Sequence, residues 1–220
     1  MKTLLFCTAY LWHPGKWRSR YHRWLALQRQ IPIDRDAIFL FDDASPHRPD
    51  DPDVRVIDAL PRELAPGGVY LYRFAERLGR DSVTHFPGWW RSFSFSLAVA
   101  ERYGFEKIVH IESDAFVLSG ELVDYMNALE SGWTTLWCPL YKFPEPNVQI
   151  ICADRFADLA AASADAAANG YHLIPEVNLP FTHVEKGFVG DRYGEYQDTI
   201  PADADYAAQV KPKMTICFRP

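Results

Sequence analysis

Two carboxylates stand close together at the end of an apolar run. The run Lys107–Leu118, KIVHIESDAFVL, passes through three β-branched residues and then reaches Glu112 and Asp114. A short and nearly unbroken apolar run is typical of a strand that is buried on both faces of a parallel sheet. Side chains alternate along a strand, so this spacing predicts that Glu112 and Asp114 share one side. Carboxylate oxygens are hard ligands suited to Mg²⁺ or Mn²⁺, which can bridge a diphosphate.

A second apolar segment also ends in carboxylates. Residues 36–41 lead into Asp42 and Asp43, and Ser45 follows. Asp and Ser are ordinary turn formers, so this segment alone is equally a strand-to-loop junction. The pair of Glu112 and Asp114 has the same structural alternative, in which Asp114 caps a turn and Glu112 forms an ion pair with an arginine. If the two strands are parallel neighbours, both pairs reach the carboxyl edge of the sheet, where ligands bind in open α/β folds.

A cluster of basic residues lies in the first turns of a helix predicted over residues 17–30. Its members are Lys16, Arg18, Arg20, His22 and Arg23. A solvated helix face is the preferred explanation of these charges, and a basic wall for an anionic ligand is the alternative. Trp12, just before this helix, either stacks on a base or packs in the core, with the core slightly preferred.

Strands and helices alternate along most of the chain. Strands are expected at residues 3–11, 36–40, 54–57, 107–118, 134–140 and 147–152. Helices are expected at residues 17–30 and 89–103, from Ser119 to Gly132, and from Asp154 to Asn169. Residues 69–78 fit a helix or an extended segment, residues 141–147 a loop, and residues 171–220 a functional loop region or a loosely packed tail. This order predicts an α/β protein with a mostly parallel sheet and helices on both faces.

The composition narrows the class of protein further. With 220 residues, 48% of them hydrophobic, the chain suits a single domain over residues 1–220. The excess of 29 Asp and Glu over 23 Lys and Arg argues against a nucleic-acid partner. Four cysteines without a CxxC pair indicate buried, reduced thiols in a cytoplasmic protein. The start, MKTLLFCTAYLW, favours a first core strand over a signal peptide, and no segment has the length of a membrane span.

The order of these parts resembles the nucleotide-sugar glycosyltransferases of the GT-A type. The closest likeness is to the large inverting family that includes many bacterial polysaccharide enzymes. The segment Phe41–Pro46, FDDASP, resembles that family's hydrophobic-Asp-Asp-Gly-Ser segment, whose acidic residues contact the nucleoside. Arg91, in the helix closed by Gly104, resembles a helix-borne arginine in the same interval. The triplet Glu112–Asp114 stands where the family carries Asp-x-Asp, which holds a metal and the diphosphate.

The resemblance covers roughly the first half of the chain and implies specific roles. Residues 1–120 would form the nucleotide-sugar-binding half, and residues 121–220 the acceptor-side half. The nucleotide-sugar would be bound by Trp12, Asp42, Asp43, Arg91 and Ser113. A divalent metal, Mn²⁺ or Mg²⁺, would be held by Glu112 and Asp114. The partners would then be a nucleotide-sugar donor and a saccharide or other hydroxyl acceptor.

The departures from the family pattern concern catalysis. Glu112 replaces the first Asp of the triplet, and Ala44 replaces a Gly. The later Glu-Asp pair that supplies the family's catalytic base has no clean copy here. Glu185, in the segment HVEK, is the first candidate for this base and Glu176 is the second. A short chain could also belong to a neighbouring GT-A family with a different stereochemical outcome.

Two other functions remain open from the sequence. The first is a non-catalytic GT-A-like domain with a degenerate site that binds a nucleotide or a glycan. The second, a nucleotidyltransferase, is disfavoured because no glycine-rich phosphate loop follows the first strand. The aromatic residues Trp89, Trp90, Tyr141 and Phe143 are platforms for an acceptor sugar in the first hypothesis, although large aromatics more often simply pack.

Overall fold

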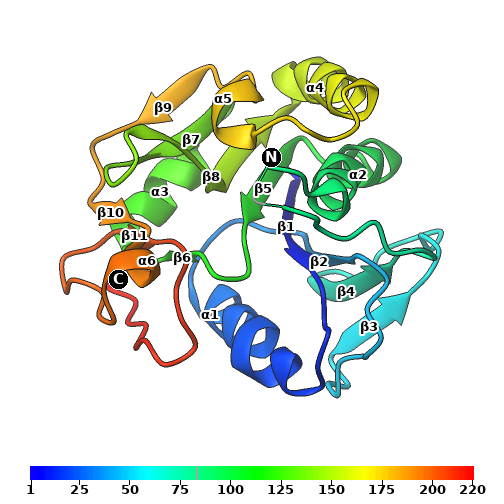
Figure 1. Cartoon of the computed structure of the whole chain (residues 1–220), viewed down its shortest axis with the longest axis horizontal. Helices are drawn as coiled ribbons and strands as arrows, with labels where there is room; N and C mark the ends of the chain where they lie inside the picture. The colour runs from blue at the N-terminus through cyan, green and yellow to red at the C-terminus, as the bar shows by residue number, and fades with distance from the viewer. Residues whose placement is uncertain (83) are drawn as a thin grey trace.

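An eight-stranded sheet runs through the protein, whose computed structural model describes residues 1–82 and 84–220 (Figure 1). Its strand order is β3-β4-β2-β1-β5-β8-β7-β9. The strands are β1 (Thr3–Ala9), β2 (Ala37–Asp42), β3 (Val54–Ile57), β4 (Gly68–Arg73), β5 (Lys107–Ile111), β7 (Trp133–Cys138), β8 (Phe143–Cys152) and β9 (His183–Glu185). All neighbours are parallel except for β8, which is antiparallel to both β5 and β7. The predicted α/β class with a mostly parallel sheet is therefore confirmed.

Helices cover both faces of the sheet, so the central strands are apolar on both sides (Figure 1). Leu4 and Phe6 of β1 belong to the core on one face, and Leu5 and Cys7 to the core on the other. The first face carries α2 (Pro87–Tyr103) and α4 (Phe156–Ala168). The second carries the π-helix η1 (Trp17–His22), α1 (Arg23–Gln30) and α3 (Gly120–Ala128). Alternation along a strand buried on two sides explains the unbroken apolar runs in the sequence.

The apolar runs at residues 3–9, 37–42 and 107–111 form neighbouring strands at the centre of the sheet. Strand β1 pairs in parallel with β2 on one side and with β5 on the other. Asp42 ends β2 and Asp114 follows β5, so both lie toward the same edge of the sheet, as predicted. The chain runs outward from β1 through β2 and then returns to place β5 on the opposite side. Such a reversal of strand order opens a crevice at the carboxyl ends of the two strands, here β1 and β5.

The run Lys107–Leu118 is not one strand, in contrast to the prediction. Strand β5 ends at Ile111, and the Ala115 amide donates to the Glu112 carbonyl in a tight turn, 2.8 Å apart. The chain then enters a second, three-stranded sheet. Its strands, in order, are β10 (Gly190–Asp191), β11 (Tyr206–Ala207) and β6 (Phe116–Val117). This turn changes the directions of the side chains that follow β5.

Several other boundaries differ from the predictions. The ambiguous residues 69–78 begin as strand β4 and continue without regular structure. The expected loop at residues 141–147 is largely strand β8, which begins at Phe143 although Pro144 and Pro146 lie within it. A shift in the register of β7 and β8 after Thr135 accompanies this stretch, and irregular pairing is where sheets tolerate proline.

The predicted helix ends are partly correct. Gly104 closes α2 in the left-handed conformation at φ 66°, and the Ser119 hydroxyl caps α3 by accepting from the Leu122 amide. Helix α3 ends at Ala128, before Gly132. Asp154 does not cap α4: it lies in the 3₁₀ turn η2 (Ala153–Arg155), and its carboxylate accepts from the Gly132 amide.

The C-terminal region contains only short elements but is packed against the sheet. Its helices are α5 (Pro175–Asn178) and α6 (Tyr193–Tyr196). Ala208 and Met214 are buried, and the Val210 amide donates to the Asp114 carbonyl at 2.9 Å. Arg23 of α1 donates to the carbonyls of Lys211 and Pro212. The region is therefore not a loose tail, and it forms one wall beside the end of β5.

None of the helices in the described part of the chain has the length and the apolar composition that a membrane span requires.

Candidate active site

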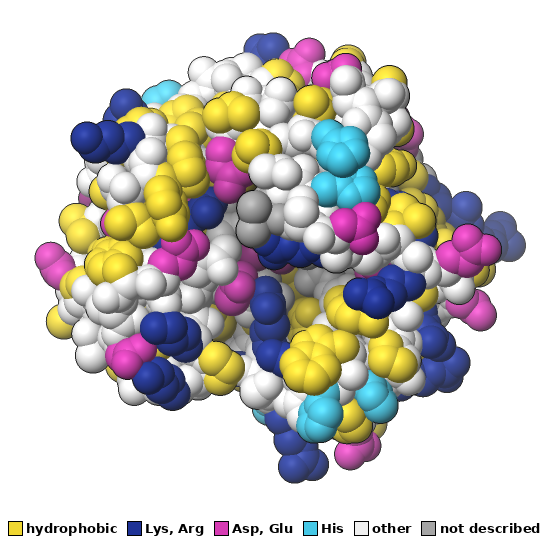
Figure 2. Space-filling view, viewed as in Figure 1, with side chains coloured by type: hydrophobic (Ala, Val, Ile, Leu, Met, Phe, Trp, Pro, Cys, Tyr) yellow, Lys and Arg dark blue, Asp and Glu magenta, His cyan; other side chains and the backbone are white. Residues whose placement is uncertain are grey.

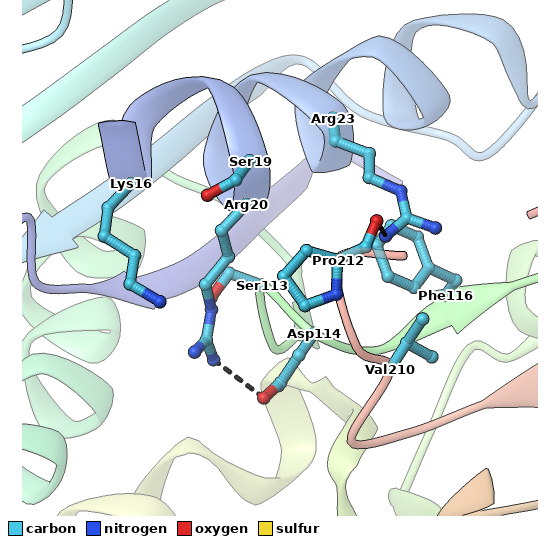
Figure 3. Close-up of a pocket in the computed structure, with 9 residues that line it drawn as sticks. All are labelled: Lys16, Ser19, Arg20, Arg23, Ser113, Asp114, Phe116, Val210 and Pro212. Carbon is cyan, nitrogen blue, oxygen red and sulfur yellow. Dashed lines mark hydrogen bonds and ion pairs between the residues drawn. The ribbon is translucent and has the colours of Figure 1, made fainter. Parts of the chain in front are cut away.

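A small pocket lies at the carboxyl end of β5, between η1, the turn after β5 and the C-terminal segment (Figure 3). Its volume is about 70 Å³, and its lining residues are Lys16, Ser19, Arg20, Arg23, Ser113, Asp114, Phe116, Val210 and Pro212. Pockets that enclose whole small molecules usually measure about 300–1,000 Å³. This pocket therefore matches a phosphate-sized group rather than a whole nucleotide. Figure 2 shows this face of the molecule hollowed near its centre, with Lys and Arg side chains inside the hollow.

Arg20 and Asp114 face each other across this pocket (Figure 3). Nη2 of Arg20 lies 2.8 Å from Oδ2 of Asp114, and Nε of Arg20 donates to the Ser113 hydroxyl at 2.6 Å. Burial opposes the charge of Arg20, but Asp114 and the other acidic groups nearby together outweigh it, so the pKa of Arg20 lies above its ordinary value. Burial raises the pKa of Asp114, although Arg20 and more weakly Arg192 act in the opposite direction. The result is a partly buried ion pair at the end of a central strand.

The basic cluster is not the solvated helix face that the sequence favoured. Arg18 and His22 are exposed, but Arg20 turns toward Asp114 and Arg23 toward the C-terminal segment. Lys16 lines the same pocket, with Nζ 5.2 Å from the centre of the Trp12 ring. The backbone here is a π-helix, whose hydrogen bonds join residues five apart and which is often found at functional sites.

Glu112 is buried and surrounded by hydrogen-bond donors. The Thr8 hydroxyl lies 2.8 Å from Oε1 and 2.9 Å from Oε2, while Trp89 Nε1 and His110 Nε2 contact Oε1. Burial alone would raise the pKa of Glu112, but its hydrogen bonds with His110 and Thr8 and the nearby Arg20 together outweigh this effect and lower the pKa. The expectation that Glu112 and Asp114 share one side is wrong, because β5 ends before Glu112. Glu112 contacts α2 on one face, and Asp114 contacts η1 on the other.

The predicted metal ligands fit a divalent cation poorly. Among the described residues, no group of three or more His, Cys, Asp or Glu side chains is arranged to hold a metal ion. Glu112 already accepts from three side chains, and the near oxygen of Asp114 is occupied by Arg20. Mg²⁺ usually needs one or two carboxylates together with water and phosphate oxygens, so Asp114 is the better placed of the two, but a cation there would lie beside the positive charge of Arg20. Metal binding stays a prediction.

Asp42 and Asp43 hold the loops around the crevice. Asp42 is fully buried, and its carboxylate accepts from the Ser45 amide and hydroxyl. Asp43 accepts from the amides of Leu78 and Gly79 at 3.0 and 2.7 Å, and it pairs with Arg91. These contacts fasten the loop between β4 and α2 to the end of β2. Their predicted contacts with a nucleoside stay a prediction.

The aromatic residues fall into two groups. Trp12 is 58% exposed, so the slight preference for a core position is wrong and its surface is open to a stacking partner. Trp90 is buried, and Trp89 stacks on Phe93 with ring centres 4.8 Å apart, which agrees with packing. Tyr141 is 49% exposed and its ring stacks on that of Phe143.

Glu185 lies far from the pocket along the sheet. It ends β9, three strands away from β5 in the strand order, which corresponds to roughly 14 Å at the usual strand spacing. Its carboxylate accepts from the Gly187 amide, and His183 Nε2 lies 3.1 Å away. The Gly187 hydrogen bond is the main reason that the pKa of Glu185 is lowered, with His183 contributing. A lowered pKa makes the carboxylate a weaker base.

Glu176 belongs to a cluster around Arg192 that the sequence analysis missed. Nη2 of Arg192 lies 2.9 Å from Glu176, and its Nε lies 2.7 Å from Glu145, which is fully buried. Arg192 also packs against the ring of Phe143 at 4.9 Å. Its neighbour Asp191 accepts from the Ala208 amide, and the Val210 amide donates to the Asp114 carbonyl, so the C-terminal segment links this cluster to the end of β5. No local signal links Glu145, Glu176 and Arg192, because they come from three separate segments.

Some contacts of the site could have been found from the sequence. In the parallel register, Phe6 pairs with His110, so two residues further along Thr8 comes opposite Glu112. The ion pair between Arg20 and Asp114 could not be predicted in this way. It depends on how η1 packs over the end of β5, and no local sequence pattern indicates that packing.

Comparisons with known proteins concern the fold. No protein-family model matches the chain, and no curated protein matches it by sequence. Among solved structures, the chain is similar to a protein described as a glycosyltransferase involved in the glycosylation of the major capsid of PBCV-1. The two share a TM-score of 0.52 and 10% sequence identity, over 95% of this chain and 94% of that chain. At this identity the likeness establishes a glycosyltransferase-like fold.

Proposed function

We propose that this protein transfers a sugar from a nucleotide-diphosphate sugar to an acceptor hydroxyl. The observation that carries the proposal is the crevice at the carboxyl ends of β1 and β5. There the fold gathers the cations of Lys16 and Arg20 with the hydroxyl of Ser113 and the carboxylate of Asp114. Positive groups beside a phosphate-sized pocket suit an anionic diphosphate. The likeness of the whole fold to a glycosyltransferase supports the same reaction.

The reaction divides the tasks among the residues around the crevice. The bond between the anomeric carbon and the donor phosphate breaks, and its electron pair stays on the leaving diphosphate. The acceptor oxygen forms the new bond to the anomeric carbon and gives its proton to a base. Arg20 and Lys16 would stabilise the charge on the diphosphate, and the exposed ring of Trp12 would stack on the nucleobase. Asp43 and Arg91 would shape the nucleoside site through the loop that they hold.

The base is predicted to be Glu185 or Glu176, and the contacts of the two residues favour Glu176. Glu176 is bound to Arg192, whose neighbour Asp191 is linked to Asp114 through backbone hydrogen bonds of Ala208 and Val210, whereas Glu185 lies at the far edge of the sheet. The exposed Tyr141 lies on the ring of Phe143 beside this cluster and would offer a surface for an acceptor sugar.

Turnover of the two glutamine variants tests this assignment. Release of nucleoside diphosphate from a panel of nucleotide-sugars is measured with a saccharide acceptor. Glu176→Gln should slow turnover by about a hundred- to ten-thousandfold, the usual contribution of a general base. Glu185→Gln and the exposed control Glu130→Gln should stay near the wild-type rate. Loss of turnover in Glu185→Gln alone would return the assignment to Glu185.

A non-catalytic domain that binds a nucleotide or glycan is the second candidate function. The observation in its favour is Glu112, whose carboxylate is held by Thr8, Trp89 and His110 instead of facing the pocket. A protein that binds a nucleotide-sugar in a thermal-shift assay, but releases no diphosphate from any donor and acceptor tested, would support this alternative.

A further inference from the structure

We infer that the guanidinium of Arg20 stabilises the diphosphate in place of a divalent cation, so that donor binding does not require metal. This inference rests on the proposed function, because it concerns the diphosphate of the same donor. It begins from the side chains that a metal would need. Glu112 is held within the protein by three donors, and Asp114 is paired with Arg20.

The guanidinium of Arg20 is fixed at two points beside the pocket. Nε donates to the Ser113 hydroxyl at 2.6 Å, and Nη2 lies 2.8 Å from Asp114 Oδ2. A guanidinium carries five N–H donors in a rigid, planar fork. In the described part of the chain, Nε makes the hydrogen bond to Ser113 and Nη2 makes the ion pair with Asp114, which leaves donors of Nη1 and Nη2 for phosphate oxygens. The side chain is 36% exposed, so a ligand in the pocket can reach it.

A metal ion and Arg20 would compete for the same carboxylate. A cation bound to Asp114 would share that carboxylate with a guanidinium that is also hydrogen-bonded to Ser113, and it would place two positive groups side by side. Lys16 lines the same pocket from the same helical segment and adds a second positive charge (Figure 3). Together Arg20 and Lys16 supply the charge that a divalent cation supplies elsewhere.

The same geometry assigns Arg20 a role during the reaction. When the bond from the anomeric carbon to the phosphate oxygen breaks, negative charge grows on the leaving diphosphate. The fixed N–H groups of Arg20 can donate to that oxygen without moving. The Asp114 and Ser113 contacts hold the guanidinium in place, so Asp114 acts as a positioning residue for Arg20.

Calorimetry of nucleoside diphosphates tests the inference directly. UDP, GDP, CDP, ADP and dTDP are titrated into the protein in EDTA and, separately, in Mn²⁺. The wild type should bind at least one of them with affinities that differ by less than about threefold between the two buffers. Arg20→Ala should weaken binding in EDTA by about ten- to a hundredfold, the range for a lost charged hydrogen bond. In Arg20→Ala, Asp114 is released, so Mn²⁺ should now strengthen binding.

Two further variants keep the test decisive. Arg20→Lys retains the charge without the planar fork and should give intermediate affinity even if Arg20→Ala folds poorly. Arg18→Ala, which changes an exposed arginine of the same π-helix, should bind like the wild type.

Wild-type binding that disappears in EDTA and returns with Mn²⁺ would overturn the inference and leave the proposed function standing. Unchanged affinity in both Arg20 variants would also overturn it. Failure of every nucleoside diphosphate to bind in either buffer would overturn the proposed function as well.

Discussion

Asp43 shows how a side chain that fits a ligand-binding motif can also hold the fold together. Its carboxylate accepts from the Leu78 and Gly79 amides and pairs with Arg91. Gly88 approaches so closely that a Cβ there would lie 2.3 Å from Asp43 Oδ2. These contacts anchor a loop and the start of α2, and the role of Asp43 in binding a nucleoside stays a prediction.

Asp43→Ala should lower the free energy of unfolding by about 3 kcal/mol, because Asp43 is buried and its loss removes the carboxylate partner of the partly buried Arg91 and of two backbone amides. Asp53→Ala is the matched control. Asp53 is 71% exposed and its ion pair with Arg29 is at the surface, so the change should stay within about 1 kcal/mol. Urea denaturation measures both variants. Equal, small changes would contradict the anchoring role of Asp43.

At the scale of elements, regular periodicity made the central sheet predictable. Strand β3 has the bounds that its sequence predicts, and Gly104 ends α2 where expected. The predicted strand bounds were wrong where a turn interrupts an apolar run or where prolines lie within a strand. The turn after Ile111 divides one apolar run into two strands that belong to different sheets. The prolines around Glu145 indicate a loop, yet cross-strand pairing with β7 keeps that segment extended.

Helix α3 offers a test of a correctly predicted helix start. The Ser119 hydroxyl accepts from the Leu122 amide, one of the amides that a helix leaves unpaired at its start. Ser119→Ala should therefore destabilise the protein by about 1 kcal/mol. Ser163→Ala in the middle of α4 should be neutral or stabilising, because alanine is the better helix former there. Thermal denaturation should separate the two variants, and equal effects would argue against the cap.

At the scale of the whole molecule, the three-layer arrangement follows from alternation of strands and helices, whereas the candidate site does not. Arg20, Asp114 and Arg192 come from three distant parts of the chain. Their arrangement depends on the C-terminal region, whose short elements lack a period and are positioned by long-range contacts such as that of Val210 with Asp114. The acidic ends of β2 and β5 could be predicted, but the partners that define their roles could not.

The layers also determine which cysteines are reactive. Cys7, Cys138 and Cys152 are buried, and Cys217 is exposed. Burial raises the pKa of Cys138 to about 12 and that of Cys152 to about 11, and the pKa of Cys7 lies well above its ordinary value for the same reason. Because the thiolate is the reactive form, iodoacetamide at pH 8 should label one thiol in the native protein and all four in denaturant. Fast labelling of three or more native thiols, counted by mass spectrometry, would contradict this packing.

The central claim is that a nucleotide-sugar binds at the carboxyl edge of β1 and β5. A second hollow, of about 410 Å³, lies at the opposite ends of the strands beside Arg29, Asp34 and Arg35, and it provides a competing location. Hydrogen–deuterium exchange with and without the nucleotide-sugar that gives the largest thermal shift distinguishes the two. The account predicts slower exchange in residues 9–23 and 112–118 on binding. Protection confined to residues 29–38 and 67–69, with the carboxyl edge unchanged, would contradict it.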